Sequence, residues 1–316
     1  MHNQNLDRMI SYYAKMLIVV SITLLSYGIF LQINTTPKLS NLPIDEQDEK
    51  TISVTPVDSY DNNTIFDEEK IESNAIDETN SNKSIEEINN QLRKKIQDNY
   101  GITIYYGKQT DGYKVSNSEI NISAFSITSP RVINQQLNKL EKTLALYPNN
   151  FFKEIDTGGI PLSIYLVNNY SDSTITGITD STYNYANISV AAIYPFEESF
   201  FHESYHYIER YLFKKGANFN SWDSLNPSDF QYGKIYNQLS YTTTFSPQSY
   251  FVNNYAQVAP AEDRASTFEY MMATNKASCL NENNTVWQKA KYIARTIETV
   301  LNSVKPNNTE YWERHL

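Results

Sequence analysis

Residues 195–206 read Pro-Phe-Glu-Glu-Ser-Phe-Phe-His-Glu-Ser-Tyr-His, and this stretch decides the fold that the sequence predicts. Pro195 suits the first position of an α-helix, because its missing amide proton would have no hydrogen-bond partner there. From this proline onward, the large apolar residues recur at helical spacing. They are Phe196, Phe200, Tyr207 and Leu212. The stretch therefore predicts a helix with one buried side.

Three residues of this helix, His202, Glu203 and His206, form the pattern His-Glu-x-x-His. Side chains four residues apart lie on the same face of a helix, so both imidazoles can bind one zinc ion. Zinc lowers the pKa of bound water to about 7, and Glu203 beside it can act as general base. The other histidines, His2 and His315, stand at the ends of the chain. We predict one Zn2+ per chain at this motif, against the alternative of two structural core histidines.

The third zinc ligand must come from further along the chain, because a catalytic zinc ion usually has three protein ligands and one open position. No His-x-x-Gly-x-x-His continuation follows the motif, so a carboxylate is expected. Glu209 lies too close on the same helix and is expected on its solvated face. Glu262, Asp263 and Glu269 lie on the next strongly predicted helix, which begins after Pro260. All three remain candidates on this reasoning.

Residues 255–269, Tyr-Ala-Gln-Val-Ala-Pro-Ala-Glu-Asp-Arg-Ala-Ser-Thr-Phe-Glu, resemble the second motif of gluzincin-type zinc metallopeptidases. This group contains anthrax lethal factor and the Pro-Pro endopeptidases, and a broader set of bacterial zinc-binding metallopeptidases shares the segment P-x-E-D-x-A. The resemblance covers two short blocks of the sequence. It implies a zincin-like fold in which Glu262 is the third zinc ligand and Tyr255 points into the active site.

The resemblance also implies how a substrate would be held. Tyr255 would donate a hydrogen bond to the oxyanion that forms at the cleaved peptide bond. In this fold type an edge strand binds extended substrate by backbone pairing, and by analogy residues 185–193 would form that edge. Arg264 stands where relatives often carry an aromatic residue, and Ser266 where they often carry an acid. The substrate preferences of the group therefore do not carry over, and Arg264 can instead pair with a nearby acid.

The remaining pattern of residues 84–316 predicts an α+β domain, with a small mixed sheet packed on the active-site helix and a mostly helical C-terminal part. Ser84 and Glu87 match a capping box at the start of a helix, and Gly101 is expected to end it. The other predicted elements are strands at 102–107, 162–167 and 185–193, helices at 130–147 and 285–304, and irregular structure from 216 to 254.

The N-terminal part predicts a membrane anchor and a spacer. Residues 16–33 carry no charge and are about long enough to cross a bilayer as a helix, as a transmembrane anchor or a signal segment. The positive-inside rule places residues 1–15 in the cytoplasm. Residues 34–83 show no helical or strand period, so we expect a disordered linker. Within it, residues 45–78 hold twelve acids and two lysines, a net charge of −10 that equals the charge of the whole chain.

These features together predict a membrane-tethered extracellular zinc endopeptidase acting on protein or peptide substrates. It would be a single-pass protein of the cell membrane, or secreted if the N-terminal segment is cleaved. The single cysteine, Cys279, cannot close an internal disulfide, which suits a Gram-positive cell surface. Nucleic acid is not an expected partner, because the folded part is near neutral. The rival function is a non-catalytic surface module, an adhesin or sensor, that keeps zinc for stability.

Overall fold

The computed structural model describes residues 50–56, 84–116, 120–192, 195–233, 250–273, 280, 284–304, 310–314 and 316. The chain divides into two compact units, Met1–Gln47 and Asp48–Leu316, and the described residues all belong to the second. The predicted cytoplasmic segment 1–15, the membrane segment 16–33 and most of the linker 34–83 lie outside the described residues. None of the helices within the described ranges is both long and apolar enough to span a bilayer.

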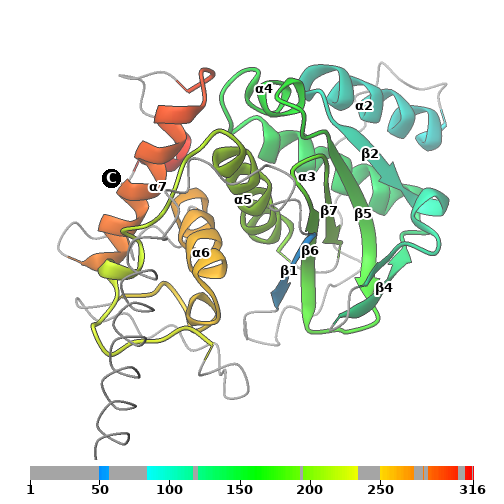
Figure 1. The fold of residues 1–316 in the computed structure, drawn as a ribbon. Helices are drawn as coiled ribbons and strands as arrows, with labels where there is room; N and C mark the ends of the chain where they lie inside the picture. Colours follow the sequence, from blue (N-terminus) through cyan, green and yellow to red (C-terminus); the bar gives the residue numbers. More distant parts are fainter. Residues whose placement is uncertain are drawn as a thin grey trace, which may run out of the picture. The chain divides into compact units, whose positions relative to one another are not determined.

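Seven strands and six helices make up this unit within the described residues (Figure 1). The strands are β1 (Thr51–Pro56), β2 (Thr103–Tyr106), β3 (Lys114–Ser116), β4 (Asn121–Ser126), β5 (Leu162–Tyr170), β6 (Ile175–Ser181) and β7 (Ala186–Ala191). The helices are α2 (Ile85–Tyr100), α3 (Pro130–Leu144), α4 (Phe151–Thr157), α5 (Phe196–Lys214), α6 (Pro260–Met272) and α7 (Thr285–Val300). Short 3-10 turns lie at Gly107–Thr110, Asp223–Leu225, Tyr255–Gln257 and Tyr311–Glu313.

Local sequence signals place the helix ends close to where they were predicted. The Ser84 hydroxyl accepts a hydrogen bond from the Glu87 amide, and the Glu87 carboxylate accepts one from the Ser84 amide. Gly101 ends α2 in the left-handed conformation, at φ 69°, which glycine adopts without steric cost. Pro195 is the residue immediately before α5, whereas the sequence predicted it as the first residue of the helix. The predicted capping box, its glycine stop and the helix of the His-Glu-x-x-His motif are thus confirmed.

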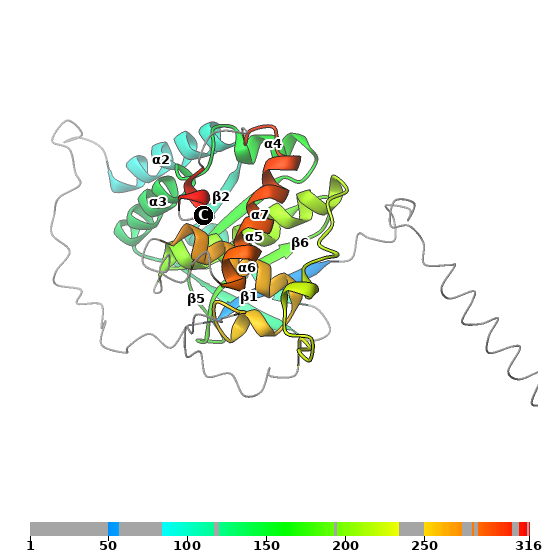
Figure 2. The same ribbon diagram turned by 90° about the vertical axis from the view of Figure 1, so that its left-hand side faces the viewer.

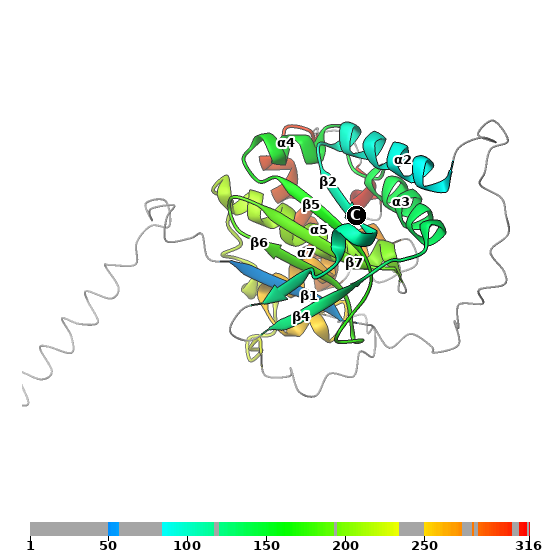
Figure 3. The same ribbon diagram turned by 90° about the vertical axis from the view of Figure 1, so that its right-hand side faces the viewer.

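The sheet is mixed, in the order β1-β6-β7-β5-β4-β3 (Figure 3). On one side, β5 pairs with β7 in parallel. On its other side, the first half of β5 pairs in parallel with β2, and the second half pairs antiparallel with β4. β6 pairs antiparallel with both β7 and β1. The sheet is therefore mixed as predicted, with four strands more than the sequence indicated.

The strand β1 corrects the expectation that residues 34–83 form no regular structure. Ile52, Ser53, Val54 and Thr55 pair with β6 in register, Val54 opposite Ile178. β-branched residues favour extended backbone, but the hydrogen bonds that fix this strand come from β6, far away in the sequence. The helix α4 and the strands β3, β4 and β6 were also missed. Each is short, and β6 is rich in threonine, so none shows a strong apolar period.

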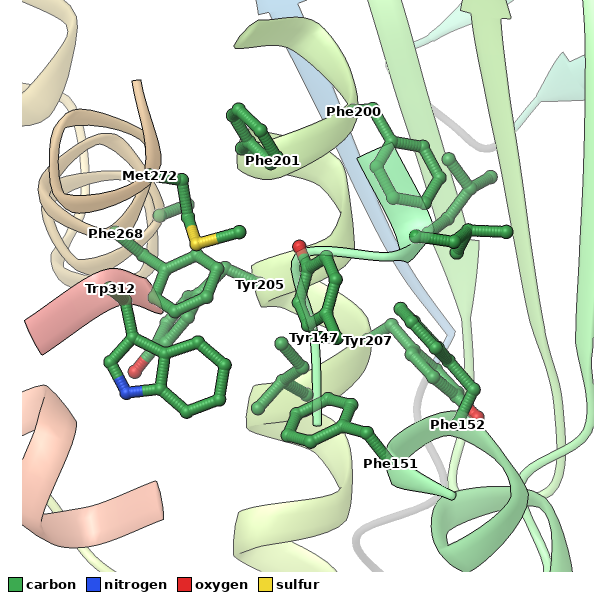
Figure 4. Close-up of a cluster of buried hydrophobic side chains, with 14 of the residues drawn as sticks. Tyr147, Phe151, Phe152, Phe200, Phe201, Tyr205, Tyr207, Phe268, Met272 and Trp312 are labelled. Atoms are coloured by element: carbon green, nitrogen blue, oxygen red, sulfur yellow. The ribbon is translucent and has the colours of Figure 1, made fainter. Parts of the chain in front are cut away.

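Helix α5 lies at the centre of the unit, between the sheet and α6. It packs on β6, β7 and β1, while α6 covers its other side and α7 lies outside α6 (Figures 1 and 2). Aromatic side chains fill the space around α5, as Figure 4 shows for Tyr147, Phe151 and Phe152. The Phe151 ring centre lies 5.8 Å from that of Trp312, whose residue is fully buried near the C-terminus. This core holds the motif helix away from water on nearly every side.

We predict that Phe151→Ala lowers the free energy of unfolding by about 3–5 kcal/mol, because it removes a ring that is 1 % exposed and leaves a cavity beside Trp312. Chemical denaturation followed by tryptophan fluorescence measures this change. Phe125→Ala is the matched control, since Phe125 is 51 % exposed and should change stability by less than about 1 kcal/mol. Equal effects of the two substitutions would contradict the described core.

Candidate metal centre

Helix α5 brings His202, Glu203 and His206 into the interior, where each is at most 4 % exposed. Buried polar groups need partners, and the neighbouring elements supply them. The Tyr147 hydroxyl lies 2.7 Å from the Ser204 hydroxyl, and the Thr179 hydroxyl of β6 donates to the Glu203 carbonyl at 3.0 Å. The sheet and the aromatic core thus fix the rotation of α5 and the direction of its motif residues.

The Nε2 atoms of His202 and His206 and Oε2 of Glu262 form a nearly regular triangle. Its edges are 3.3 Å between the two nitrogens, 3.0 Å from His202 to Glu262 and 3.4 Å from His206 to Glu262. Three ligand atoms at about 2.0–2.1 Å from a tetrahedral zinc ion would be separated by about 3.3 Å. These residues therefore fit a zinc ion as two imidazole ligands and one carboxylate, and together they form a cluster that can hold a metal ion.

The other two candidate carboxylates occupy different positions. Asp263, next to Glu262 on α6, accepts hydrogen bonds from Lys289 at 2.6 Å and Trp222 at 2.9 Å, on the side away from the histidines. Glu269 lies behind His202, on the side of the ring away from Glu262, with its Oε2 3.4 Å from Nδ1 of His202. A carboxylate on the second nitrogen of a metal-binding histidine orients its ring and raises its basicity.

Glu209 does not lie on a solvated face of α5, as the sequence analysis expected. It is 6 % exposed and forms an ion pair with Arg264 of α6. The pair is buried because α6 packs on α5, which the sequence pattern of α5 alone does not reveal. The guanidinium of Arg264 also lies 4.6 Å from the ring centre of Phe219. The expectation that Arg264 can pair with a nearby acid is confirmed.

Glu203 lies beside the metal-ligand triangle and is fully buried. Its Oε1 accepts a hydrogen bond from the Thr55 hydroxyl, and its Oε2 has no hydrogen-bond partner among the described residues. Burial raises the pKa of Glu203, and the two nearby histidines offset part of that rise. Gly177 of β6 makes room for this carboxylate, because a Cβ atom there would lie 2.8 Å from Cγ of Glu203. A base with a raised pKa is suited to exchanging protons near neutral pH.

Tyr255 lies on the 3-10 turn just before α6 and reaches the same region. Its ring centre is 5.8 Å from that of His202, and its hydroxyl donates to the backbone carbonyl of Val54 in β1. The phenol of Tyr255 thus already donates to a peptide carbonyl next to the triangle. The structure brings together His202, Glu203, His206, Tyr255 and Glu262, the five residues that the sequence analysis selected.

Two residues of the site were missed, Ser53 and Thr55 of β1. The Ser53 hydroxyl lies 2.7 Å from Nε2 of His206 and donates to Oε1 of Glu262 at 3.0 Å. The only signal in the sequence is the alternation of residues 51–56, too short to stand out within an acidic segment. The position of β1 also corrects the expected substrate edge. Residues 185–193 contain β7, an inner strand, whereas β6 is the strand that β1 covers.

His202 and Glu262 shift each other's pKa. Burial alone would lower the pKa of His202, but the carboxylates of Glu262 and Glu269 on its two sides outweigh it and raise that pKa to about 10. Burial acts to raise the pKa of Glu262, but the neighbouring histidines hold it well below its usual range. Both shifts favour a protonated His202 beside a charged Glu262, so a metal ion that binds here competes with that proton.

Comparisons with known proteins give one distant likeness. No protein-family model matches the chain, and no curated protein matches it. Among solved structures, the chain is similar to a protein from Bacteroides caccae described as a "putative zinc-binding metallo-peptidase". The two share 12 % sequence identity with a TM-score of 0.48, over 73 % of this chain and 90 % of the other.

We predict that Lys289→Met lowers the free energy of unfolding by about 3–5 kcal/mol, because it leaves the buried Asp263 carboxylate without its cation. Thermal and chemical denaturation measure the loss. Lys291→Met on the same helix is the control, since this half-buried lysine only lies over the Trp287 ring. A Lys289 variant as stable as the control would show that the pair does not anchor α6.

We also predict that zinc binding near neutral pH releases about one proton from His202. Because the pKa of His202 is raised, protons compete with zinc throughout the neutral range. The apparent zinc affinity should therefore fall as the pH is lowered and rise as it is raised toward 10. Calorimetric titration of zinc in buffers with different ionisation enthalpies measures the released protons. A binding enthalpy that is independent of the buffer would contradict the prediction.

Proposed function

We propose that this protein is a zinc-dependent endopeptidase that hydrolyses peptide bonds in protein or peptide substrates. The observation that carries the proposal is the triangle of His202, His206 and Glu262 with Glu203 beside it. Glu203 is held close to the ligand atoms by α5, but it is not one of the three. A site that only binds metal for stability has no use for a buried carboxylate at this place.

The chain's own residues have distinct parts in the proposed reaction. Zinc, when bound, supplies Lewis-acid chemistry that polarises a carbonyl and acidifies water. Glu203 takes a proton from the attacking water and passes it to the leaving amide nitrogen, for which its raised pKa is suited. Tyr255 donates its phenolic proton in a hydrogen bond to the carbonyl oxygen of the cleaved bond. Glu269 keeps the ring of His202 in place from the other side.

The proposed place of action is outside the cell, on a single-pass membrane anchor. The uncharged run at residues 16–33 and the basic residues before it support this orientation. A cleaved segment would give the same activity in secreted form. Substrates would then be proteins at the cell surface or in its surroundings. Because residues outside 45–78 carry equal numbers of acids and bases, an electrostatic affinity for nucleic acid is not part of the proposal.

One observation favours the rival function, a zinc-stabilised surface module without catalysis. The Ser53 hydroxyl lies close to two of the three ligand residues and would close the site. Structural zinc sites, however, are closed by cysteine, histidine or carboxylate ligands, and catalytic sites keep a position open. A neutral serine hydroxyl fits a reversible contact better than a permanent fourth ligand.

The proposal is tested by zinc content and hydrolysis in the full-length chain. We expect about one zinc per chain in the parent and in Glu203→Gln, and at least a tenfold loss of zinc affinity in Glu262→Ala. Hydrolysis of a quenched-fluorescent peptide library should fall by about 10²–10⁴ in Glu203→Gln. Glu197→Gln, at an exposed position of α5, is the control for both measurements.

The two functions give different results in this experiment. A parent that binds no zinc in zinc-supplemented buffer overturns the proposal. Bound zinc with hydrolysis that is equal in the parent and in Glu203→Gln, and that stays equal when both carry a substitution that displaces β1 from the site, would favour the non-catalytic module instead.

A further inference from the structure

Strand β1 lies where an extended peptide would have to bind. It is the outermost strand beside β6 and pairs with it antiparallel, with Ser53 opposite Thr179 and Thr55 opposite Gly177. The side chains of Ser53 and Thr55 point to the side of α5, and both residues are under 10 % exposed. Backbone pairing with a sheet edge is a general way for proteins to bind extended peptides. β1 is such a peptide, supplied by the chain itself.

Four of the five site residues, all except His202, form hydrogen bonds with β1. The Ser53 hydroxyl bonds to His206 and Glu262, and the Thr55 hydroxyl donates to Glu203. Between them, the carbonyl of Val54 accepts the hydrogen bond from Tyr255. The strand therefore presents one peptide carbonyl to Tyr255 and two short hydroxyl side chains to the metal ligands and the base. A substrate that pairs with β6 at this place must therefore displace β1.

The two faces of β1 differ, and only one of them serves an apolar cluster. Core positions are normally apolar, yet the two buried side chains of β1 are hydroxyls whose partners are metal ligands and a catalytic base. Ile52 and Val54 lie on the opposite side of the sheet, where they are half-buried and pack against the apolar cluster that contains Ile178. At the N-terminal end of the strand, Lys50 forms a salt bridge with Asp180 at 2.9 Å, and Arg210 contacts Thr51. Lys50 and Thr51 are exposed, so these contacts contribute little to holding the strand on β6.

We propose that residues 51–56 are a built-in peptide ligand that fills the substrate cleft beside β6 and lowers the activity of the full-length chain by competing with substrate. This inference rests on the proposed function. Because β1 belongs to the same chain as the site, its effective concentration there is on the order of 1 mM, which a free peptide must match. The ligands of the opened cleft are extended peptides with short hydroxyl side chains two residues apart, on either side of the carbonyl that meets Tyr255.

The test displaces β1 by substitution within the full-length chain. Ser53→Trp cannot fit between His206 and Glu262, so the strand should leave the cleft. Thr51→Trp is the matched control, on the same side of the same strand but at an exposed position. The double variant Ser53→Ala, Thr55→Ala removes the hydroxyl contacts without added bulk and should act in the same direction more weakly. Circular dichroism and thermal unfolding establish that each variant is folded.

The probe is a fluorescein-labelled peptide with the sequence of residues 48–59, titrated into metal-free protein and followed by anisotropy. We expect Ser53→Trp to bind it at least about tenfold more tightly than the parent and Thr51→Trp, because the tethered strand no longer competes. With zinc added, hydrolysis of a quenched-fluorescent peptide of the same sequence should be faster in Ser53→Trp by a similar factor.

The outcomes separate this inference from the proposed function. Equal peptide binding by the parent, Thr51→Trp and Ser53→Trp would overturn the inference, as would a parent that hydrolyses the peptide as fast as the folded Ser53→Trp variant. Tighter peptide binding by Ser53→Trp without hydrolysis, although zinc is bound, would support β1 as the resident ligand of the cleft. That result would at the same time overturn the endopeptidase function.

Discussion

Holding two imidazole nitrogens and one carboxylate oxygen within 3.0–3.4 Å of one another in a buried place constrains the rest of the structure. In the absence of metal, such a cluster must be balanced by charge and hydrogen bonds, since burial of unpaired polar groups is costly. Glu262 and Glu269 balance His202 from its two sides. The cluster also requires α5 and α6 to keep a fixed relative position, because its ligands come from both helices.

The contact between α5 and α6 is accordingly built from more than apolar packing. Arg264 reaches from α6 to Glu209 on α5, and Asp263 is tied to Lys289 on α7. Each ion pair is directional, so together they fix the rotation of α6 and aim Glu262 at the histidines. Aromatic rings around Tyr147, with Phe268 of α6 among them, fill the core beside both helices. Charge pairs thus set the orientation of α6, and apolar burial supplies the stability of the unit.

The edge of the sheet joins the fold and the site. β6 carries Gly177, which makes room for Glu203, and Thr179, which holds the backbone of α5. The same strand pairs with β1, so the residues that complete the sheet also contact His206, Glu262 and Glu203. β6 offers its backbone hydrogen bonds to β1, and it could offer the same bonds to an extended peptide in place of β1.

The sequence by itself determined the local features: the helical spacing of His202 and His206, the glutamate between them, and the capping box at Ser84. These depend on residues a few positions apart, whose geometry the helix period fixes. The third carboxylate is different, because Glu262 lies 60 positions from His202 and its neighbours Asp263 and Glu269 have the same chemistry. Only the packing of α6 on α5 decided which of them meets the histidines. The tertiary structure alone also decided the burial of Glu209 and the place of Ser53, 153 positions before His206, because long-range contacts leave no periodic pattern in either segment.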